Sequence, residues 1–256
     1  MEIRFLGTCA CDYSPKLKTE FKDKFDADAR RSSCVLINKG ILVDCGEHTL
    51  DSMRIAGVKK EDITDIVITH LHDDHFNEKN IESIAASCVR KLRLWVRDDA
   101  VLPEMNGVEI MRMQRKVAYE LSEGVFVTGL IANHDETTFP QHLYFEREGK
   151  SFFYGCDGAW LVYDTFTWLY RKKITLFVFD GTCGDYSGDF RMAEHNSIPM
   201  IRLMLPSLKT VDAITDDTLI FISHIAPSLH KTHKETTELL KNDKINVAYD
   251  DETVII

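Results

Sequence analysis

The architecture that we expect for this chain follows from one stretch, Ile66-Val67-Ile68-Thr69-His70-Leu71-His72-Asp73-Asp74-His75. Its first four residues are all β-branched and predict a short buried strand. Three histidines and two aspartates crowd the next six residues. Neutral imidazole and carboxylate are ligands of Zn²⁺ and its first-row neighbours. We therefore expect a metal-binding loop rather than a solvated turn, which would favour Gly, Asn or Asp over three histidines.

The spacing within this loop is compatible with two ions. His70 and His72 are two residues apart, so in a tight loop their side chains can converge on one ion. Asp74 and His75 lie further along the loop and can reach a second ion a few ångströms away.

Three later stretches predict buried strands that each end at one further candidate ligand. A strand followed at once by an isolated Asp or His places a rigid ligand at the edge of a sheet. Each of these signals is weak alone, because a histidine at the end of a strand is more often an ordinary hydrogen-bonded residue. The three candidates are His134, Asp157 and His224.

The loop His70–His75 has the pattern H-x-H-x-D-H and resembles the metallo-β-lactamase superfamily. The resemblance implies an α/β (α+β) protein with a four-layer αββα sandwich and a metal site along one edge of two facing sheets. Most members hydrolyse an ester, thioester, amide or phosphodiester with a metal-bound hydroxide. Leu6-Gly7-Thr8 and Asp44-Cys45-Gly46 are similar to two branches, tRNase Z and the phosphodiesterases associated with carbon–phosphorus lyase. Because the resemblance spans nearly the whole chain, we expect one domain, residues 1–256.

Position by position, the resemblance implies a complete dinuclear site. Two divalent ions about 3.5–4 Å apart lower the pKa of a bridging water and clamp an anionic transition state. Zn²⁺ suits this ligand set best, although Mn²⁺ or Fe²⁺ would accept it. The implied ligands are His70, His72 and His134 for one ion, Asp74, His75 and His224 for the other, and Asp157 as the bridge.

The resemblance also implies a proton donor for the leaving group. In the phosphodiesterase branch, an Asp-Gly-Thr element and a His-x-Ser element follow the bridging aspartate. Here Asp180-Gly181-Thr182 and His195-Asn196-Ser197 match them. His195 would contact the scissile phosphate and protonate the departing oxygen, while Asp180 would orient its imidazole. The alternative is that His195 is an ordinary residue at the start of a helix. The implied catalytic set is Asp74, Asp180 and His195.

Two features separate the chain from these branches. The tRNA endonucleases carry a long Gly- and Lys-rich arm that grips the tRNA, and the sequence between Asp157 and His224 contains no such insertion. The carbon–phosphorus lyase-associated enzyme carries a cysteine-rich structural zinc site near its N-terminus. Only Cys9 and Cys11 remain of that site, and whether they bind a further metal stays open.

Charge and composition constrain the substrate and the compartment. Of the 256 residues, 31 are basic and 41 are acidic, a net charge of −10. Long nucleic acids are therefore unlikely partners, because phosphate neutralisation by a basic surface supplies most of their affinity. No apolar run is long enough to span a membrane and no signal peptide opens the chain. Seven cysteines without regular spacing predict a reducing cytoplasm.

The expected function is hydrolysis of a small anionic phosphodiester, cyclic or nucleotide-derived. A tRNA 3′-processing endonuclease is one alternative, and a thioesterase or lactamase is a weaker one because Asp180 and His195 would have no role there. A non-catalytic, metal-held scaffold or ligand sensor is another. Related enzymes are commonly dimers, so by analogy we expect a homodimer.

Several local predictions are less tightly constrained. Ile3–Thr8 is expected to form an edge strand, and residues 116–121 a short turn or helix. Residues 248–256 are expected to form a closing hairpin. His142 is expected in a turn after Pro140, outside the site.

Overall fold

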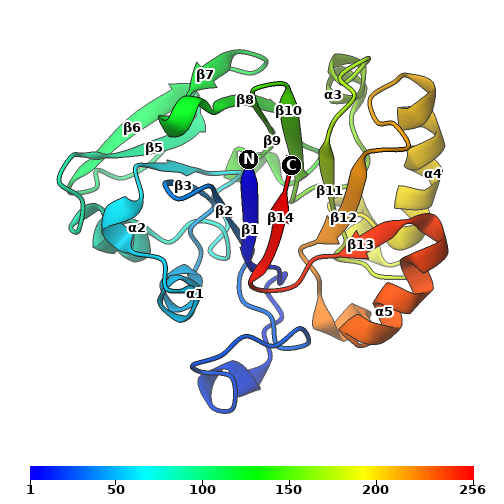
Figure 1. Ribbon diagram of the computed structural model, residues 1–256, viewed down its shortest axis with the longest axis horizontal. Coiled ribbons are helices and arrows are strands. Elements are labelled where there is room, and N and C mark those ends of the chain that lie inside the picture. The colour runs from blue at the N-terminus through cyan, green and yellow to red at the C-terminus, as the bar shows by residue number, and fades with distance from the viewer.

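Two seven-stranded sheets form the centre of the protein in a computed structural model that describes residues 1–256 (Figure 1). The first sheet contains, in spatial order, β14 (Glu252–Ile255), β1 (Glu2–Gly7), β2 (Cys34–Ile37), β3 (Ile41–Val43), β4 (Asp65–Val67), β5 (Leu92–Arg97) and β6 (Val108–Met113). The second contains β13 (Ile245–Val247), β12 (Leu219–Ser223), β11 (Leu176–Asp180), β10 (Lys150–Gly155), β9 (Gln141–Arg147), β8 (Phe126–Ile131) and β7 (Ala118–Glu120).

Helices cover the outer face of each sheet (Figure 1). The first sheet packs against α1 (Thr49–Ala56) and α2 (Glu78–Ala85), and the second against α3 (Tyr163–Trp168), α4 (Ile198–Thr210) and α5 (His233–Leu240). The four layers are therefore helices, sheet, sheet and helices, which confirms the αββα sandwich that the resemblance implied.

Successive side chains of a strand point to opposite faces of its sheet, and this explains why the two sheets pack against each other. Phe152 and Tyr154 of β10 belong to the core between the sheets, whereas Phe153 between them belongs to the core under the helices. Phe5 of the first sheet and Phe221 of the second stack across the interface, with ring centroids 5.8 Å apart. Since both faces of the central strands are covered, these strands read as continuous apolar runs in the sequence.

The parallel parts of the two sheets position the candidate site. In the first sheet β3, β4, β5 and β6 are parallel neighbours, and in the second β10, β11, β12 and β13 are. Within each group the carboxyl ends of the strands lie at one edge of the sheet. The loop after β4 and the residues after β10, β11 and β12 carry most of the polar residues predicted for the site.

Three local predictions were wrong because strand pairing depends on partners distant in sequence. β1 is an inner strand between β14 and β2. Residues 118–120 form strand β7, which pairs with β8. Residues 248–256 are not a hairpin, since β13 pairs with β12 in the second sheet and β14 with β1 in the first.

Asp250 holds the chain where it crosses between the sheets. Its carboxylate is 2 % exposed and accepts hydrogen bonds from the Thr8 hydroxyl at 2.8 Å and the Arg31 amide at 2.7 Å. Burial raises the pKa of Asp250 to about 6, although Arg30 and these hydrogen bonds partly offset that effect. The crossing is therefore fixed by buried polar contacts together with a turn in which the Glu252 amide donates to the Tyr249 carbonyl at 3.1 Å.

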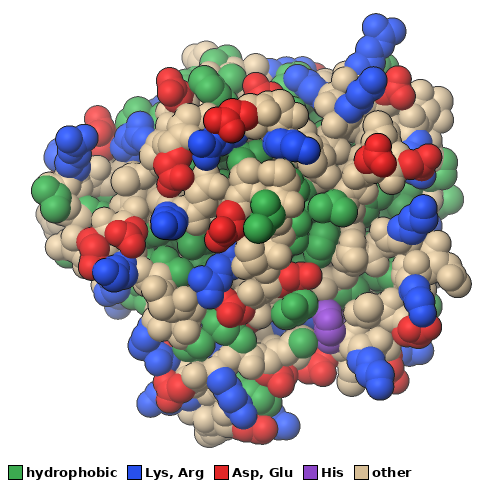
Figure 2. Space-filling model, in the orientation of Figure 1, with side chains coloured by type: hydrophobic (Ala, Val, Ile, Leu, Met, Phe, Trp, Pro, Cys, Tyr) green, Lys and Arg blue, Asp and Glu red, His purple; other side chains and the backbone are tan.

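The surface carries interspersed charges of both signs. Figure 2 shows Lys and Arg side chains scattered among Asp and Glu side chains over the whole visible face, without a broad patch of one sign. No helix is long and apolar enough to cross a membrane.

The core between the sheets yields a stability prediction. Phe145 is fully buried and stacks on Phe152 with centroids 5.7 Å apart. Phe145→Ala should lower the free energy of unfolding by about 3–5 kcal/mol, because it removes buried apolar surface and leaves a cavity. Phe190→Ala is the control, since Phe190 is 86 % exposed. Urea denaturation measures both variants, and equal stabilities would contradict this account of the core.

Candidate metal centre

The loop after β4 is held at both ends by backbone hydrogen bonds. The amides of His75 and Phe76 donate to the His72 carbonyl at 2.9 and 2.8 Å and close a tight turn. The Leu71 amide donates to Thr138 at 3.0 Å, and the Cys45 amide donates to the His75 carbonyl at 2.7 Å. The chain therefore presents its histidines from a fixed turn rather than from a free loop.

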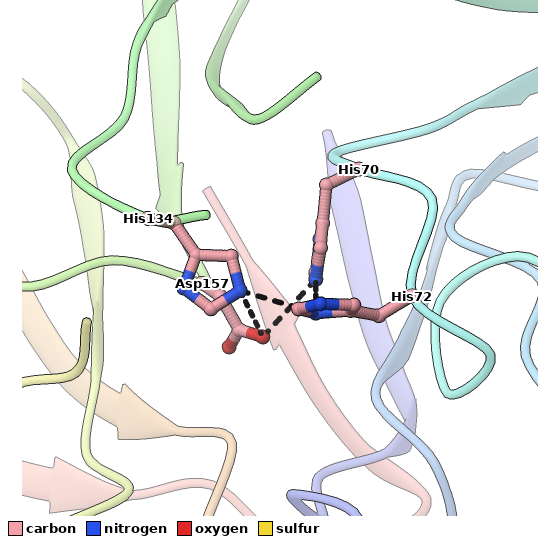
Figure 3. A group of neighbouring side chains, drawn as sticks. All are labelled: His70, His72, His134 and Asp157. Carbon is pink, nitrogen blue, oxygen red and sulfur yellow. Dashed lines mark hydrogen bonds and ion pairs between the residues drawn. The ribbon is translucent and has the colours of Figure 1, made fainter. Parts of the chain in front are cut away.

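The first cation group consists of His70, His72, His134 and Asp157, whose potential ligand atoms lie within 4.8 Å of one another. Figure 3 shows the three imidazoles and the carboxylate pointing toward a common centre. Nδ1 of His72 lies 2.9 Å from Nε2 of His70 and 3.2 Å from Nε2 of His134. Oδ2 of Asp157 lies 3.4 Å from Nε2 of His70.

The second cation group consists of Asp74, His75, Asp157 and His224. Nε2 of His75 lies 3.2 Å from Nε2 of His224 and 3.3 Å from Oδ2 of Asp74. Oδ2 of Asp157 lies 3.4 Å from Nε2 of His75 and so faces both groups. The structure thus brings together all seven residues that the sequence proposed as ligands, with Asp157 shared between the two groups.

The two groups fit divalent cations. Oδ1 of Asp157 is buried and has no hydrogen-bond partner. Imidazole nitrogens from different histidines face each other at 2.9–3.2 Å, and two of them cannot both present lone pairs at that distance without repulsion. Cations between them would remove this repulsion and place positive charge beside the buried Asp157 carboxylate.

Protons balance the charge of the second cation group in the metal-free protein. Burial lowers the pKa of His75 and of His224, but neighbouring carboxylates more than offset it, so the pKa of His224 rises to about 10. Burial alone would raise the pKa of Asp157, yet His224 and His75 hold it well below its usual value. By contrast, burial leaves the pKa of His70 and of His134 below the ordinary histidine value.

Asp44 orients one ligand and is a functional residue that the sequence reasoning missed. It follows β3, is fully buried, and accepts a hydrogen bond from Nδ1 of His75 at 2.7 Å. The Thr69 amide donates to the same carboxylate at 2.8 Å. Because Nδ1 of His75 carries the proton, Nε2 is free for a cation. The available signal was an aspartate at the end of a strand, in Asp44-Cys45-Gly46.

His195 lies beside the second cation group rather than at a helix start. Its Nδ1 donates to Oδ2 of Asp180 at 2.8 Å and lies 3.9 Å from Oδ1 of Asp157. The N-cap of α4 is Ser197, so His195 precedes the helix. Burial lowers the pKa of His195, but the Asp180 carboxylate more than offsets it, so the pKa is raised overall.

A cavity of about 160 Å³ opens onto both cation groups. His72, Asp74, His134 and His195 line it, and the loop after β1 contributes Cys11. Arg191 and Glu194 line it from the segment before His195. Neither Cys9 nor Cys11 belongs to any of the groups of three or more His, Cys, Asp or Glu side chains that could hold a metal ion.

The predicted turn at His142 was wrong. It lies on β9, is 1 % exposed, and neither ring nitrogen has a hydrogen-bond partner. Its ring packs under Gly158, where an added Cβ would come within 2.5 Å of the ring. Burial lowers the pKa of His142 to about 4, so it is a neutral packing residue beneath the turn that follows Asp157.

A sequence-family model described as anti-Pycsar protein Apyc1 matches residues 25–101, well under half of the chain. The matched region includes the loop His70–His75 and Asp44 but none of the later ligands. No curated protein matches the chain significantly.

Solved structures match nearly the full length of the chain at low sequence identity. The metallo-β-lactamase-fold protein YhfI from Bacillus subtilis is 13% identical, covers 99% of this chain and 98% of its own, and gives a TM-score of 0.72. Zn²⁺-bound PqqB from Methylobacterium extorquens is 13% identical, with both chains covered at 100% and a TM-score of 0.75. Human tRNase Z, short form, is 18% identical, covers 100% and 99%, and gives a TM-score of 0.69. These similarities confirm the predicted fold.

Loss of the shared carboxylate should affect both cations. Asp157→Ala should weaken both, because its Oδ2 faces both groups, whereas His134→Ala should weaken only the cation of the first group. Metal titration with elemental analysis distinguishes the two patterns. Binding of two ions to Asp157→Ala with unchanged affinity would contradict the shared role.

Cation binding should release protons. The pKa of His224 is about 10 in the metal-free protein, so its imidazole is protonated near neutral pH and must lose a proton before Nε2 can bind a cation. Affinity should therefore rise as the pH increases from about 6 to about 9. Calorimetric titration in two buffers of different ionisation enthalpy measures the protons released, and a binding enthalpy independent of buffer would contradict the prediction.

Proposed function

We propose that this protein, which has the metallo-β-lactamase fold, is a metal-dependent phosphodiesterase. Its substrate would be a small anionic phosphodiester, cyclic or nucleotide-derived. One observation carries the proposal: His195, held by Asp180, lines the cavity beside the shared ligand Asp157. Hydrolysis of a phosphodiester with a poor leaving group needs such a proton donor.

The two cation groups would hold two divalent ions, for which Zn²⁺ is our first choice and Mn²⁺ or Fe²⁺ the alternatives. Bound ions would supply a water of lowered pKa and positive charge for the phosphate. Asp74 lines the cavity, and we assign to its carboxylate the positioning of the attacking water. Its Oδ2 lies 3.4 Å from Nε2 of His224, which keeps the carboxylate at the second cation group.

His195 would act as the general acid. Its Nδ1 hydrogen bond to Asp180 fixes the ring and favours the protonated imidazole. The remaining nitrogen, Nε2, has no protein hydrogen bond and belongs to a side chain that lines the cavity. The Nε2 proton would pass to the departing alkoxide oxygen as the P–O bond breaks, leaving a neutral imidazole still bonded to Asp180.

The volume of the cavity and the net charge of the protein favour a small substrate. The cavity of about 160 Å³ suits a phosphate and part of one attached group. The net charge is −10, and the visible face in Figure 2 mixes both signs. A long nucleic acid would find no extended basic surface on that face.

A tRNA 3′-processing endonuclease is the second candidate, favoured by the similarity to human tRNase Z. Against it, the chain between Asp157 and His224 is occupied by α3, β11 and α4 without a long arm. A non-catalytic scaffold or ligand sensor is the third. It leaves unexplained why the His195–Asp180 pair faces the cavity.

The assembly and the compartment are further proposals. All seven cysteines are free thiols, which suits the reducing cytoplasm that the sequence predicted. A homodimer is proposed by analogy alone, and light scattering of the purified protein tests it.

The role of His195 predicts a dependence on the leaving group. His195→Ala should lower kcat about 10²–10⁴-fold for a phosphodiester with an alkoxide leaving group, because that oxygen must be protonated as it departs. The loss should be much smaller for bis-p-nitrophenyl phosphate, whose phenoxide leaves without a proton. Metal content should stay unchanged, since His195 is not one of the seven ligands assigned to the two cation groups.

A panel of substrates tests the proposal against its alternatives. Metal-loaded protein is assayed on cyclic nucleotides, bis-p-nitrophenyl phosphate, a precursor tRNA, an ester and a thioester. Turnover of the small phosphodiesters supports the proposal, and cleavage of only the precursor tRNA favours the endonuclease. Full metal occupancy without turnover of any substrate favours the sensor and overturns the proposed function.

A further inference from the structure

Thr182 lies between a predicted metal ligand and the proposed acid pair. It is 3 % exposed and follows Asp180 and Gly181 in the turn after β11. Its hydroxyl oxygen lies 2.7 Å from Nδ1 of His224 and 2.9 Å from the His224 carbonyl oxygen. The turn is tied to β12, because the Gly181 amide donates to the Ser223 carbonyl at 2.8 Å. One buried hydroxyl therefore contacts both the side chain and the backbone of His224.

The direction of these hydrogen bonds is determined by their chemistry. A carbonyl oxygen only accepts, so the Thr182 hydroxyl donates its single proton to the His224 carbonyl. The same oxygen then accepts from Nδ1 of His224, which must carry a proton. With the proton on Nδ1, Nε2 of a neutral His224 presents its lone pair to the second cation group.

A charged oxygen lies near the same nitrogen, and the backbone of His224 adds a second role for the Thr182 hydroxyl. Oδ1 of Asp157 lies 2.7 Å from Nδ1 of His224, and its negative charge also favours a proton on that nitrogen. His224 also has a φ of 56°, in the left-handed region that a histidine rarely adopts. The hydroxyl bond to its carbonyl helps to hold this backbone conformation.

The two histidines of the second cation group are thus oriented differently. His75 donates its Nδ1 proton to the Asp44 carboxylate, whereas His224 donates its Nδ1 proton to a neutral hydroxyl. The Thr182 amide also donates to Oδ1 of Asp180 at 2.8 Å. The other oxygen of Asp180 accepts from His195. A single residue therefore joins His224 to the proposed acid pair.

We propose that Thr182 is a positioning residue that fixes the Nδ1–H tautomer and ring orientation of His224 and thereby sets the affinity of the second cation group for its metal. This inference rests on the proposed function and adds to it, because it identifies the residue that holds the metal ligand His224 in position next to Asp180 and His195. Metal binding tests it without any turnover, so its failure and the failure of the proposed function remain distinguishable.

Three variants isolate the hydroxyl. Thr182→Val keeps the shape of the side chain and removes the hydroxyl, and should weaken the second cation about 10–100-fold while the first binds as in the wild type. Thr182→Ser restores the hydroxyl and should restore the affinity. Thr236→Val is the control, since Thr236 is 3 % exposed and its hydroxyl bonds only the Lys231 carbonyl of the α5 region, at 3.4 Å.

Competitive titration of Co²⁺ against a chromophoric chelator gives the two affinities, and the visible spectrum of bound Co²⁺ reports the ligand geometry. The spectrum of the second Co²⁺ should change in Thr182→Val and return in Thr182→Ser. Unchanged affinities in Thr182→Val, or equal weakening of both ions, would overturn the proposal. If Thr182→Val does not fold, Thr182→Ala replaces it and the same two outcomes decide.

Discussion

The arrangement of this protein depends on one buried carboxylate, Asp157, placed among five imidazoles. A carboxylate at 4 % exposure is strongly destabilising unless positive charge surrounds it. Protonated His75 and His224 supply that charge in the metal-free protein, and divalent cations would supply it in the loaded one. The fold therefore has to deliver histidines from several strands to the two faces of one aspartate.

The sandwich meets this requirement because the ligands lie just after the ends of its strands. The core between the sheets, including the Phe5–Phe221 contact, fixes the sheets against each other, so the loop after β4 meets the residues after β10 and β12. Around the ligands and the proposed acid lie residues that orient them through hydrogen bonds. Asp44 orients His75, Thr182 orients His224, and Asp180 orients His195. The same turn after β11 thus serves both metal binding and proton transfer.

The wrong predictions share a physical cause. Residues 116–121 and 248–256 have local patterns compatible with several structures, and the choice was made by distant partners, β8 for β7 and β1 for β14. His142 follows Pro140 and looks like a turn residue, yet it begins pairing with β8 at once and packs under Gly158. The preference of a short segment for one structure is overridden where residues distant in sequence pair with it as a strand or pack closely against it.

The sequence alone determined the ligand loop and the strands that carry His134, Asp157 and His224, because buried β-branched runs and clustered metal-binding side chains leave local signatures. With the resemblance, it also identified His195 and Asp180. Only the tertiary structure decided that Asp44 and Thr182 hold the two histidines of the second cation group. Thr182 and His224 are 42 residues apart, and a hydrogen bond between a hydroxyl and an imidazole leaves no periodic trace in the chain. Such contacts exist only after the two sheets have packed.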